Sequence, residues 1–162
     1  MFDAVLLRSA EDLLAAMRAK KLKLATAESC TGGLLSGLLT EIPGSSDVFD
    51  RGFVTYSNEA KEKMLGIPRA LIERYGAVSE QAARAMAEGA LHYAPADVSV
   101  AITGVAGPDG GTAEKPVGLV HFAAARCGRD TVHEAQRFGN IGRGEVRMKS
   151  LAVALELIRK IV

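Results

Sequence analysis

The segment TAESCTGGLLSGLL, residues 26–39, places four reactive side chains next to each other where a predicted strand meets a predicted helix. They are a carboxylate, a hydroxyl, a thiol and a second hydroxyl, from Glu28, Ser29, Cys30 and Thr31. A serine at such a turn can project its hydroxyl outward, while the following N–H groups and the helix dipole stabilise an oxyanion. The segment is therefore a candidate for acyl transfer with Ser29 as nucleophile, although it is also typical of an N-cap formed by Ser29 or Thr31.

Cys30 is the rival nucleophile, because a thiol at a helix N-terminus can have a lowered pKa. Adjacent residues of a strand or turn point in opposite directions, so we expect one of Ser29 and Cys30 to face a pocket and the other to pack. Gly32 and Gly33 would let backbone and substrate approach closely. The segment matches neither GxSxG nor GxxxxGK[ST], which disfavours an α/β-hydrolase elbow and a P-loop.

A serine nucleophile needs a base, and Lys61 is the candidate. It lies in NEAKEKML, residues 58–65, where desolvation and the positive end of a helix dipole would both favour a neutral amine. Tyr56, at the end of the preceding predicted strand, could hydrogen-bond between Ser29 and Lys61. Two lysines and two glutamates in NEAKEKML are equally typical of a solvated helix face, so composition alone does not single out Lys61.

A second signal is the glycine-rich segment GVAGPDGG, residues 104–111, which follows a β-rich stretch ending at Thr103. The N–H groups of such a loop can hold an anion, and Gly104 and Gly107 are its first two glycines. Turn chemistry alone would also explain the Pro-Asp-Gly-Gly sequence.

A third signal is GNIGRGEVRMKS, residues 139–150, which brings Arg143, Arg147 and Lys149 to the start of the last predicted helix. A phosphate there would meet guanidinium groups and helix N–H groups together. Arg143 and Arg147 lie four residues apart, which is also the spacing of a solvated helix stripe.

The pattern of apolar residues predicts alternating helices and strands followed by a hairpin. Helices are expected at residues 5–20, 31–41, 58–65, 68–76, 79–93 and 144–162, and strands at 21–29, 48–57, 97–104, 117–127 and 131–138. This order predicts a single α/β domain over residues 1–162, a three-layer α/β/α sandwich with a mixed sheet. Ligands of open α/β sheets bind beyond the carboxyl ends of strands. Three predicted strands end in the polar residues 28–31, 56–58 and 103–107, which would make one pocket if these ends converge.

Composition limits the classes of partner. The net charge is +1, from 20 basic and 19 acidic residues, and aromatic residues make up 5%, so neither a nucleic acid nor a membrane is expected as a partner. The two cysteines form no CxxC pair, which favours a reducing, cytoplasmic setting. The three histidines show no metal-ligand spacing, so no metal is expected. The broad apolar face of the last helix suggests a homo-oligomer, a dimer or larger.

Taken together, the chain resembles the CinA C-terminal family, whose enzymes are nicotinamide-nucleotide amidases. The matching motifs are TAESCTGG (26–33), VTYSNEAKEKMLGI (54–67) and AITGVAGPDGGTAEKPVG (101–118), in order along nearly the entire chain. In many relatives a Gly-Asp-Arg precedes the final arginines, whereas this chain has GNIGR, which leaves the alignment of Arg143 open.

The resemblance implies hydrolysis of nicotinamide mononucleotide to nicotinate mononucleotide and ammonia, in pyridine-nucleotide salvage and without a cofactor. It places the nucleophile on Ser29, the tyrosine on Tyr56 and the lysine on Lys61. The expected substrate contacts are Glu28, Thr31, Gly32, Gly33, Thr103, Gly104, Gly107 and Arg143, with the N–H groups of residues 31–33 holding the oxyanion. Two other hypotheses remain open at this point: a nucleotide-binding module without catalysis, and an amidase for another carboxamide.

Overall fold

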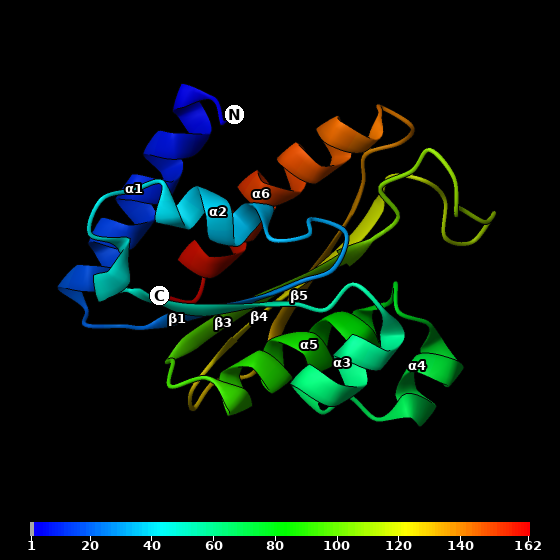
Figure 1. The fold of residues 1–162 in the computed structure, drawn as a ribbon, viewed down its shortest axis with the longest axis horizontal. Helices are drawn as coiled ribbons and strands as arrows, with labels where there is room; N and C mark the ends of the chain where they lie inside the picture. The colour runs from blue at the N-terminus through cyan, green and yellow to red at the C-terminus, as the bar shows by residue number, and fades with distance from the viewer. Residues whose placement is uncertain (1) are drawn as a thin grey trace.

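The computed structural model describes residues 2–162 as a five-stranded sheet between two layers of helices (Figure 1). The strands are β1 (Leu24–Glu28), β2 (Phe49–Val54), β3 (Val98–Gly104), β4 (Leu119–Arg126) and β5 (Val132–Arg137). One layer contains α1 (Ala4–Ala19), α2 (Leu34–Thr40) and α6 (Arg143–Arg159), and the other contains α3 (Asn58–Leu65), α4 (Arg69–Tyr75) and α5 (Glu80–Tyr93). A short 3₁₀ helix, Ser45–Asp47, precedes β2. The predicted three-layer α/β/α sandwich is confirmed.

The sheet is mixed, with strand order β2-β1-β3-β4-β5. β1 is parallel to both β2 and β3, whereas β3, β4 and β5 are antiparallel to one another in turn. Parallel neighbours end at the same edge of a sheet, so the segments after β1, β2 and β3 leave it side by side. The polar segments at the ends of these three strands therefore converge, which is the condition for them to form one site.

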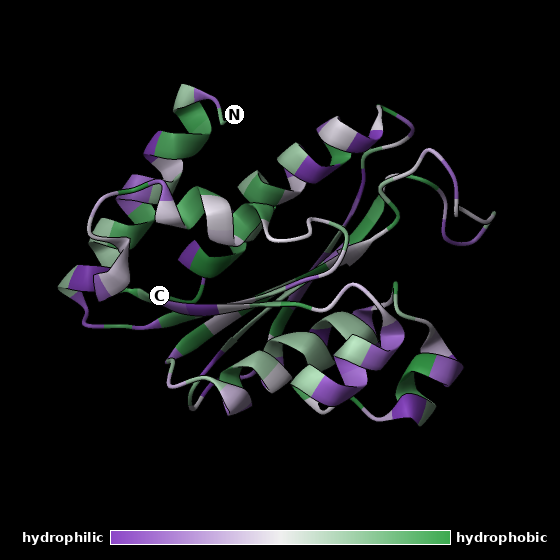
Figure 2. Cartoon of the chain, viewed as in Figure 1, coloured by the Kyte–Doolittle hydropathy of each residue, from purple (hydrophilic) through white to green (hydrophobic). Residues whose placement is uncertain are grey.

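Each face of the sheet has its own hydrophobic core, and residues of β1 alternate between them. Leu24 packs with the layer of α1, α2 and α6, whereas Ala27 packs with the layer of α3, α4 and α5. The helices show the same division, with hydrophobic residues turned toward the sheet and hydrophilic residues outward (Figure 2). The alternation continues past β1, so it decides which layer each reactive side chain meets.

One departure from the predicted boundaries lies directly after Ser29. The sequence predicts a helix from Thr31, but α2 begins at Leu34 because Gly32 and Gly33 have φ angles of 58° and 96°. Positive φ cannot continue a right-handed helix, so residues 30–33 form a turn instead. β1 and β2 are also shorter than predicted, and α6 ends at Arg159.

Across residues 2–162, no helix combines the length and apolar character needed to cross a membrane.

Candidate active site

Ser29 and Lys61 meet at the carboxyl edge of the sheet. The Nζ atom of Lys61 donates a hydrogen bond to Ser29 Oγ at 3.1 Å and another to the carbonyl oxygen of Thr55 at 2.8 Å. The side chain of Ser57 caps α3 by accepting a hydrogen bond from the Ala60 N–H, which fixes the first turn of the helix that carries Lys61. The two residues are 32 positions apart in the sequence, so the fold itself creates this pair.

Lys61 is a buried lysine without a counter-ion among the described residues. Its residue is only 1% exposed, and no carboxylate of residues 2–162 forms an ion pair with it. Burial lowers the pKa of Lys61 below its ordinary value, against a smaller opposing electrostatic effect of Cys30. A neutral Lys61 amine can accept the Ser29 proton, since the hydrogen bond between them then reverses direction.

Cys30 points away from this pair. It is 5% exposed and packs in the core beneath α1, α2 and α6, whereas Ser29 meets α3 on the opposite side. Burial raises the pKa of the Cys30 thiol to about 11, so the thiol is protonated at neutral pH. The two side chains point to opposite helix layers, as adjacent residues were expected to do, and the geometry favours Ser29 as nucleophile.

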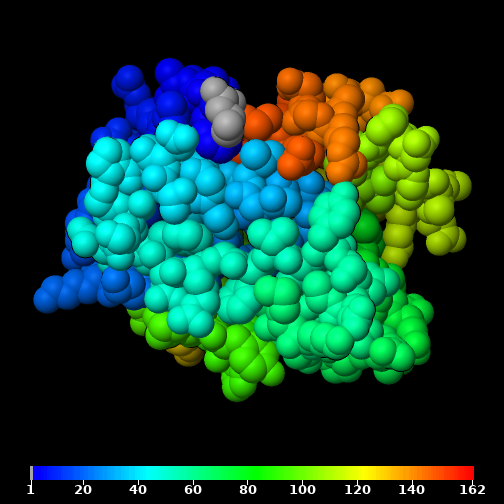
Figure 3. Space-filling model, in the orientation of Figure 1, coloured from blue at the N-terminus to red at the C-terminus, as the bar shows by residue number. Residues whose placement is uncertain are grey.

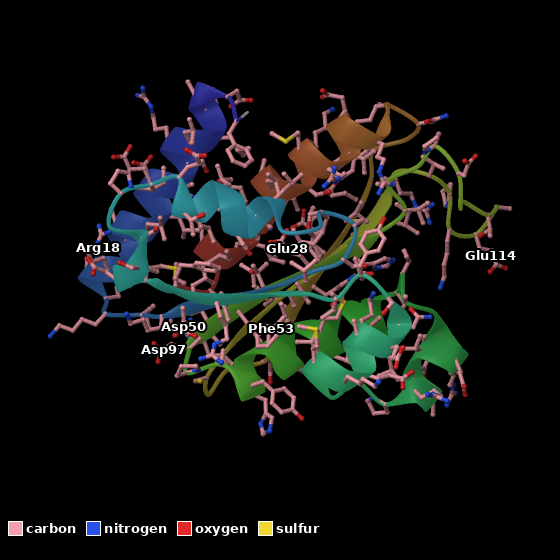
Figure 4. All side chains as sticks on the ribbon, viewed as in Figure 1. Arg18, Glu28, Asp50, Phe53, Asp97 and Glu114 are labelled. Atoms are coloured by element: carbon pink, nitrogen blue, oxygen red, sulfur yellow. The ribbon has the colours of Figure 1, made fainter. Side chains whose placement is uncertain are left out.

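Glu28 holds the turn together. Its Oε2 accepts hydrogen bonds from the N–H groups of Gly33 (3.1 Å) and Leu35 (3.0 Å), and its Oε1 accepts from the N–H and the hydroxyl of Ser36 (both 2.8 Å). The carboxylate lies between α2 and the sheet (Figure 4). Both carboxylate oxygens accept hydrogen bonds from the protein, so Glu28 orients the turn in this structure. The predicted contact between Glu28 and the substrate stays a prediction.

The same contacts change the expected set of oxyanion donors. The N–H of Gly33 is used by Glu28, and the N–H of Gly32 donates to the carbonyl of Ser29 at 3.0 Å. Within the described chain the N–H of Thr31 donates to no acceptor, and the hydroxyl of buried Thr31 also has none. Of the three predicted amide donors, only that of Thr31 is available.

Tyr56 occupies a different place from the predicted relay. It is 61% exposed, and its hydroxyl accepts a hydrogen bond from Nη2 of Arg143 at 2.9 Å. Lys61 reaches Ser29 directly in this structure, and the role of Tyr56 between these two residues stays a prediction. At the surface the segment after β2 meets the start of α6, far from it in sequence (Figure 3).

Arg143 joins three parts of the predicted pocket. Besides Tyr56, it contacts the carbonyl of Gly107 at 2.9 Å through Nη1, which links α6 to the glycine-rich loop. Gly107 has φ 82°, and a Cβ there would lie 2.5 Å from Val117. Arg143 itself is exposed, so its guanidinium lies at the surface beside the loop.

Thr103 and Gly104 serve packing in this structure. The hydroxyl of Thr103 is buried and donates to the carbonyl of Ala77 at 2.7 Å, which ties β3 to the segment before α5. A Cβ on Gly104 would lie 2.7 Å from a Val120 methyl group and 2.8 Å from the Leu119 carbonyl. Thr103 therefore packs against the segment before α5 and Gly104 against β4, and the substrate contacts at these two positions stay predictions.

Two features were not assigned from the sequence. The carbonyl of Thr55 anchors the Lys61 amine, and Arg147 of α6 donates to the carbonyls of Cys30 and Thr31, both at 3.1 Å. Every residue has a backbone carbonyl, so the residue types in the sequence could not indicate that the Thr55 carbonyl contacts Lys61. Arg147 had one, its four-residue spacing from Arg143, but spacing does not tell which group it binds.

Among residues 2–162, no group of three or more His, Cys, Asp or Glu side chains is placed to bind a metal ion. The Nδ1 atom of His121 lies 2.9 Å from Nε2 of His133, so these two rings are partners of each other.

Comparison with known proteins gives a consistent assignment. The model of the CinA C-terminal domain matches residues 7–162. This chain therefore belongs to the CinA C-terminal domain family. The crystal structure of the competence/damage inducible protein CihA from Agrobacterium tumefaciens has a TM-score of 0.97 and 48% sequence identity, covering 99% of this chain and 97% of that one. A CinA superfamily protein from Escherichia coli has a TM-score of 0.92 and 35% identity, covering 100% and 94%.

Curated relatives fall into two length classes. A protein from Enterobacter agglomerans named nicotinamide-nucleotide amidohydrolase PncC is 51% identical over 143 residues, covering 88% of this chain and 86% of that protein. A CinA-like protein from Mycobacterium marinum is 50% identical but much longer, with 93% of this chain matching 35% of it. This chain spans 25 to 36% of the length of several other long relatives.

Proposed function

We propose that this chain is an amidohydrolase that converts nicotinamide mononucleotide and water to nicotinate mononucleotide and ammonia, in pyridine-nucleotide salvage. The observation that carries the proposal is the direct contact between Ser29 and a buried, unpaired Lys61. The similarity to the Enterobacter agglomerans amidohydrolase, a relative of comparable length, supports the choice of substrate.

The reaction begins with a neutral Lys61 taking the hydroxyl proton of Ser29 as Oγ attacks the carboxamide carbon. The tetrahedral intermediate collapses when its C–N bond breaks, and the Lys61 ammonium gives its proton to the leaving nitrogen, which departs as ammonia. Water then attacks the Ser29 ester as Lys61 takes one of its protons. Lys61 returns that proton to Ser29 Oγ when the ester C–O bond breaks, and the released acid gives its proton to solvent and leaves as the carboxylate. Protons and atoms balance without a metal or cofactor.

The substrate phosphate belongs at the start of α6 in this scheme. Arg143 is exposed and lies next to the glycine-rich loop through its contact with Gly107. A guanidinium in that position can bind phosphate oxygens in a bidentate manner. Tyr56, which contacts the same guanidinium, would then act on the substrate and Arg143 and not on the proton of Ser29.

The test is ammonia release from nicotinamide mononucleotide in the presence of a chelator, with wild type and Ser29→Ala side by side. Wild-type activity and a loss of at least about 1000-fold in the variant would support the proposal. Mononucleotide binding without ammonia release would instead identify a binding module. Release of ammonia only from other carboxamides would retain the chemistry and change the substrate.

A further inference from the structure

Arg147 reaches from α6 into the turn that follows Ser29. Its Nε donates to the carbonyl of Cys30 and its Nη2 donates to the carbonyl of Thr31, each at 3.1 Å. The planar guanidinium thus holds two consecutive peptide units in a fixed orientation. A Cβ on Gly32 would lie 3.5 Å from Nη2, so the turn packs closely against this side chain.

The peptide between Cys30 and Thr31 is trans, since within the described chain Gly107–Pro108 is the only cis bond. In a trans peptide the N–H points opposite to the carbonyl. The Thr31 N–H therefore points away from Arg147 and α6. Ser29 meets Lys61 of α3, which lies in the other helix layer. The Thr31 N–H, which points away from α6, therefore points toward the side of the turn on which Ser29 contacts Lys61.

The Thr31 N–H also lacks an acceptor in the part of the chain that the structure describes, although Thr31 is fully buried. Buried N–H groups are almost always hydrogen-bonded, so one left free beside a nucleophile indicates a position that a ligand completes. Its neighbours at Gly32 and Gly33 are engaged within the turn.

We propose that Arg147 is a positioning residue that aims and polarises the Thr31 N–H toward the oxyanion formed when Ser29 attacks. The proposal rests on the proposed function for its reaction. A cation on the Cys30 carbonyl draws electron density through the peptide and makes the N–H at its other end a stronger donor. Arg147 acts through the backbone and does not itself touch the substrate.

The main competing role for Arg147 is that of a phosphate ligand, like Arg143. The geometry argues against it, because Nε and Nη2 of Arg147 are both committed to backbone carbonyls. Arg143 is the more exposed of the two and lies beside the glycine-rich loop. The two arginines should therefore affect different kinetic constants.

The test compares Arg147→Ala and Arg147→Lys with Arg143→Ala, using nicotinamide mononucleotide and the phosphate-free nicotinamide riboside. We expect both Arg147 variants to lower kcat about 100-fold with KM changed less than about 2-fold, in the same proportion for both substrates. Lysine should fail to restore kcat because it cannot hold two carbonyls in a plane. A rise in KM confined to the mononucleotide, with kcat unchanged, would make Arg147 a phosphate ligand and overturn the proposal.

A second measurement separates this inference from the choice of substrate. A fluorophosphonate probe reacts when Ser29 Oγ forms a bond to phosphorus, fluoride leaves and Lys61 takes the proton, and its phosphoryl oxygen occupies the oxyanion position. Intact-mass detection should show slower phosphonylation in both Arg147 variants, even if neither nicotinamide compound is hydrolysed. An unchanged rate, or no reaction in wild type, would overturn the inference. Thermal unfolding checks that each variant is folded. If Arg147→Ala is unfolded, the rate of Arg147→Lys decides the outcome.

Discussion

At the scale of single residues, the contact between Ser29 and Lys61 couples chemistry to pH. Burial lowers the pKa of Lys61 below its ordinary value, so the reactive, unprotonated amine is present at lower pH than it is for an exposed lysine. We expect kcat to rise with pH through this lowered pKa and then to level off. A kcat that falls as pH increases over this range would contradict Lys61 as the base. Measurement of ammonia release across pH 5 to 10 checks this.

The same pKa shift affects stability. Between the lowered pKa of Lys61 and its ordinary value of 10.5, the unfolded chain binds a proton that the native chain does not. The free energy of unfolding therefore increases with pH over this window. The variant Lys61→Met lacks this dependence, so wild type should gain stability relative to it as pH rises toward 10.5. Urea unfolding of both proteins at several pH values measures the difference, and parallel curves would exclude the shift.

Cys30 offers a direct test of the rival nucleophile. The variant Cys30→Ala should retain ammonia release within about 3-fold and lose about 1 kcal/mol of stability from the core. In native wild type, iodoacetamide should modify exposed Cys127 and leave Cys30 intact, because the Cys30 thiol is buried with a pKa raised to about 11. Peptide mass spectrometry reads both sites. Loss of activity like that of Ser29→Ala would return the nucleophile to Cys30.

At the scale of elements, the turn between β1 and α2 depends on one buried carboxylate. Replacing Glu28 with glutamine puts an NH₂ group among backbone N–H donors that need acceptors. We expect Glu28→Gln to lower the free energy of unfolding by about 2 to 3 kcal/mol and to lower kcat, since the turn carries Ser29. Exposed Glu41, just after α2, provides the matched control Glu41→Gln, which should change neither quantity. Equal effects of the two variants would show that the capping role is minor.

The elements also show how far sequence alone could predict the site. Periodicity located the six α-helices and five strands, because burial on both faces of a sheet leaves a strong pattern, but not the 3₁₀ helix at Ser45–Asp47. It misplaced the start of α2, since a helix signal cannot show that Gly32 and Gly33 adopt positive φ. It also could not show the hydrogen bond between Tyr56 and Arg143, because these residues are 87 positions apart in the sequence.

At the scale of the whole molecule, the pocket draws on segments from across the chain. Arg143 links the start of α6 to Tyr56 and Gly107, so substrate binding should depend on it more than catalysis does. We expect Arg143→Ala to raise KM for nicotinamide mononucleotide about 10-fold or more, with little change in kcat. Exposed Lys149, on the same helix, provides the control variant Lys149→Ala. A selective loss of kcat in Arg143→Ala would contradict a binding role.

The packing of α6 within the molecule also bears on self-association. The apolar residues of α6 are buried within the chain, against α1 and the sheet, so the broad apolar face that suggested a homo-oligomer is already covered. The oligomeric state stays a prediction, which sedimentation equilibrium can test.

The side chains of β1 and of the residues after it alternate between the two faces of the sheet, and this alternation also determines which residue meets Lys61. Glu28 and Cys30 face the layer of α1, α2 and α6, and Ser29 faces α3, so the parity of the strand decides which side chain Lys61 meets. Deleting one residue from β1 would bring the thiol of Cys30 into the place of the Ser29 hydroxyl, and inserting one would bring the carboxylate of Glu28 there. In the proposed mechanism, the identity of the attacking atom thus depends on whether the strand has an odd or an even number of residues, as well as on the residue at that position.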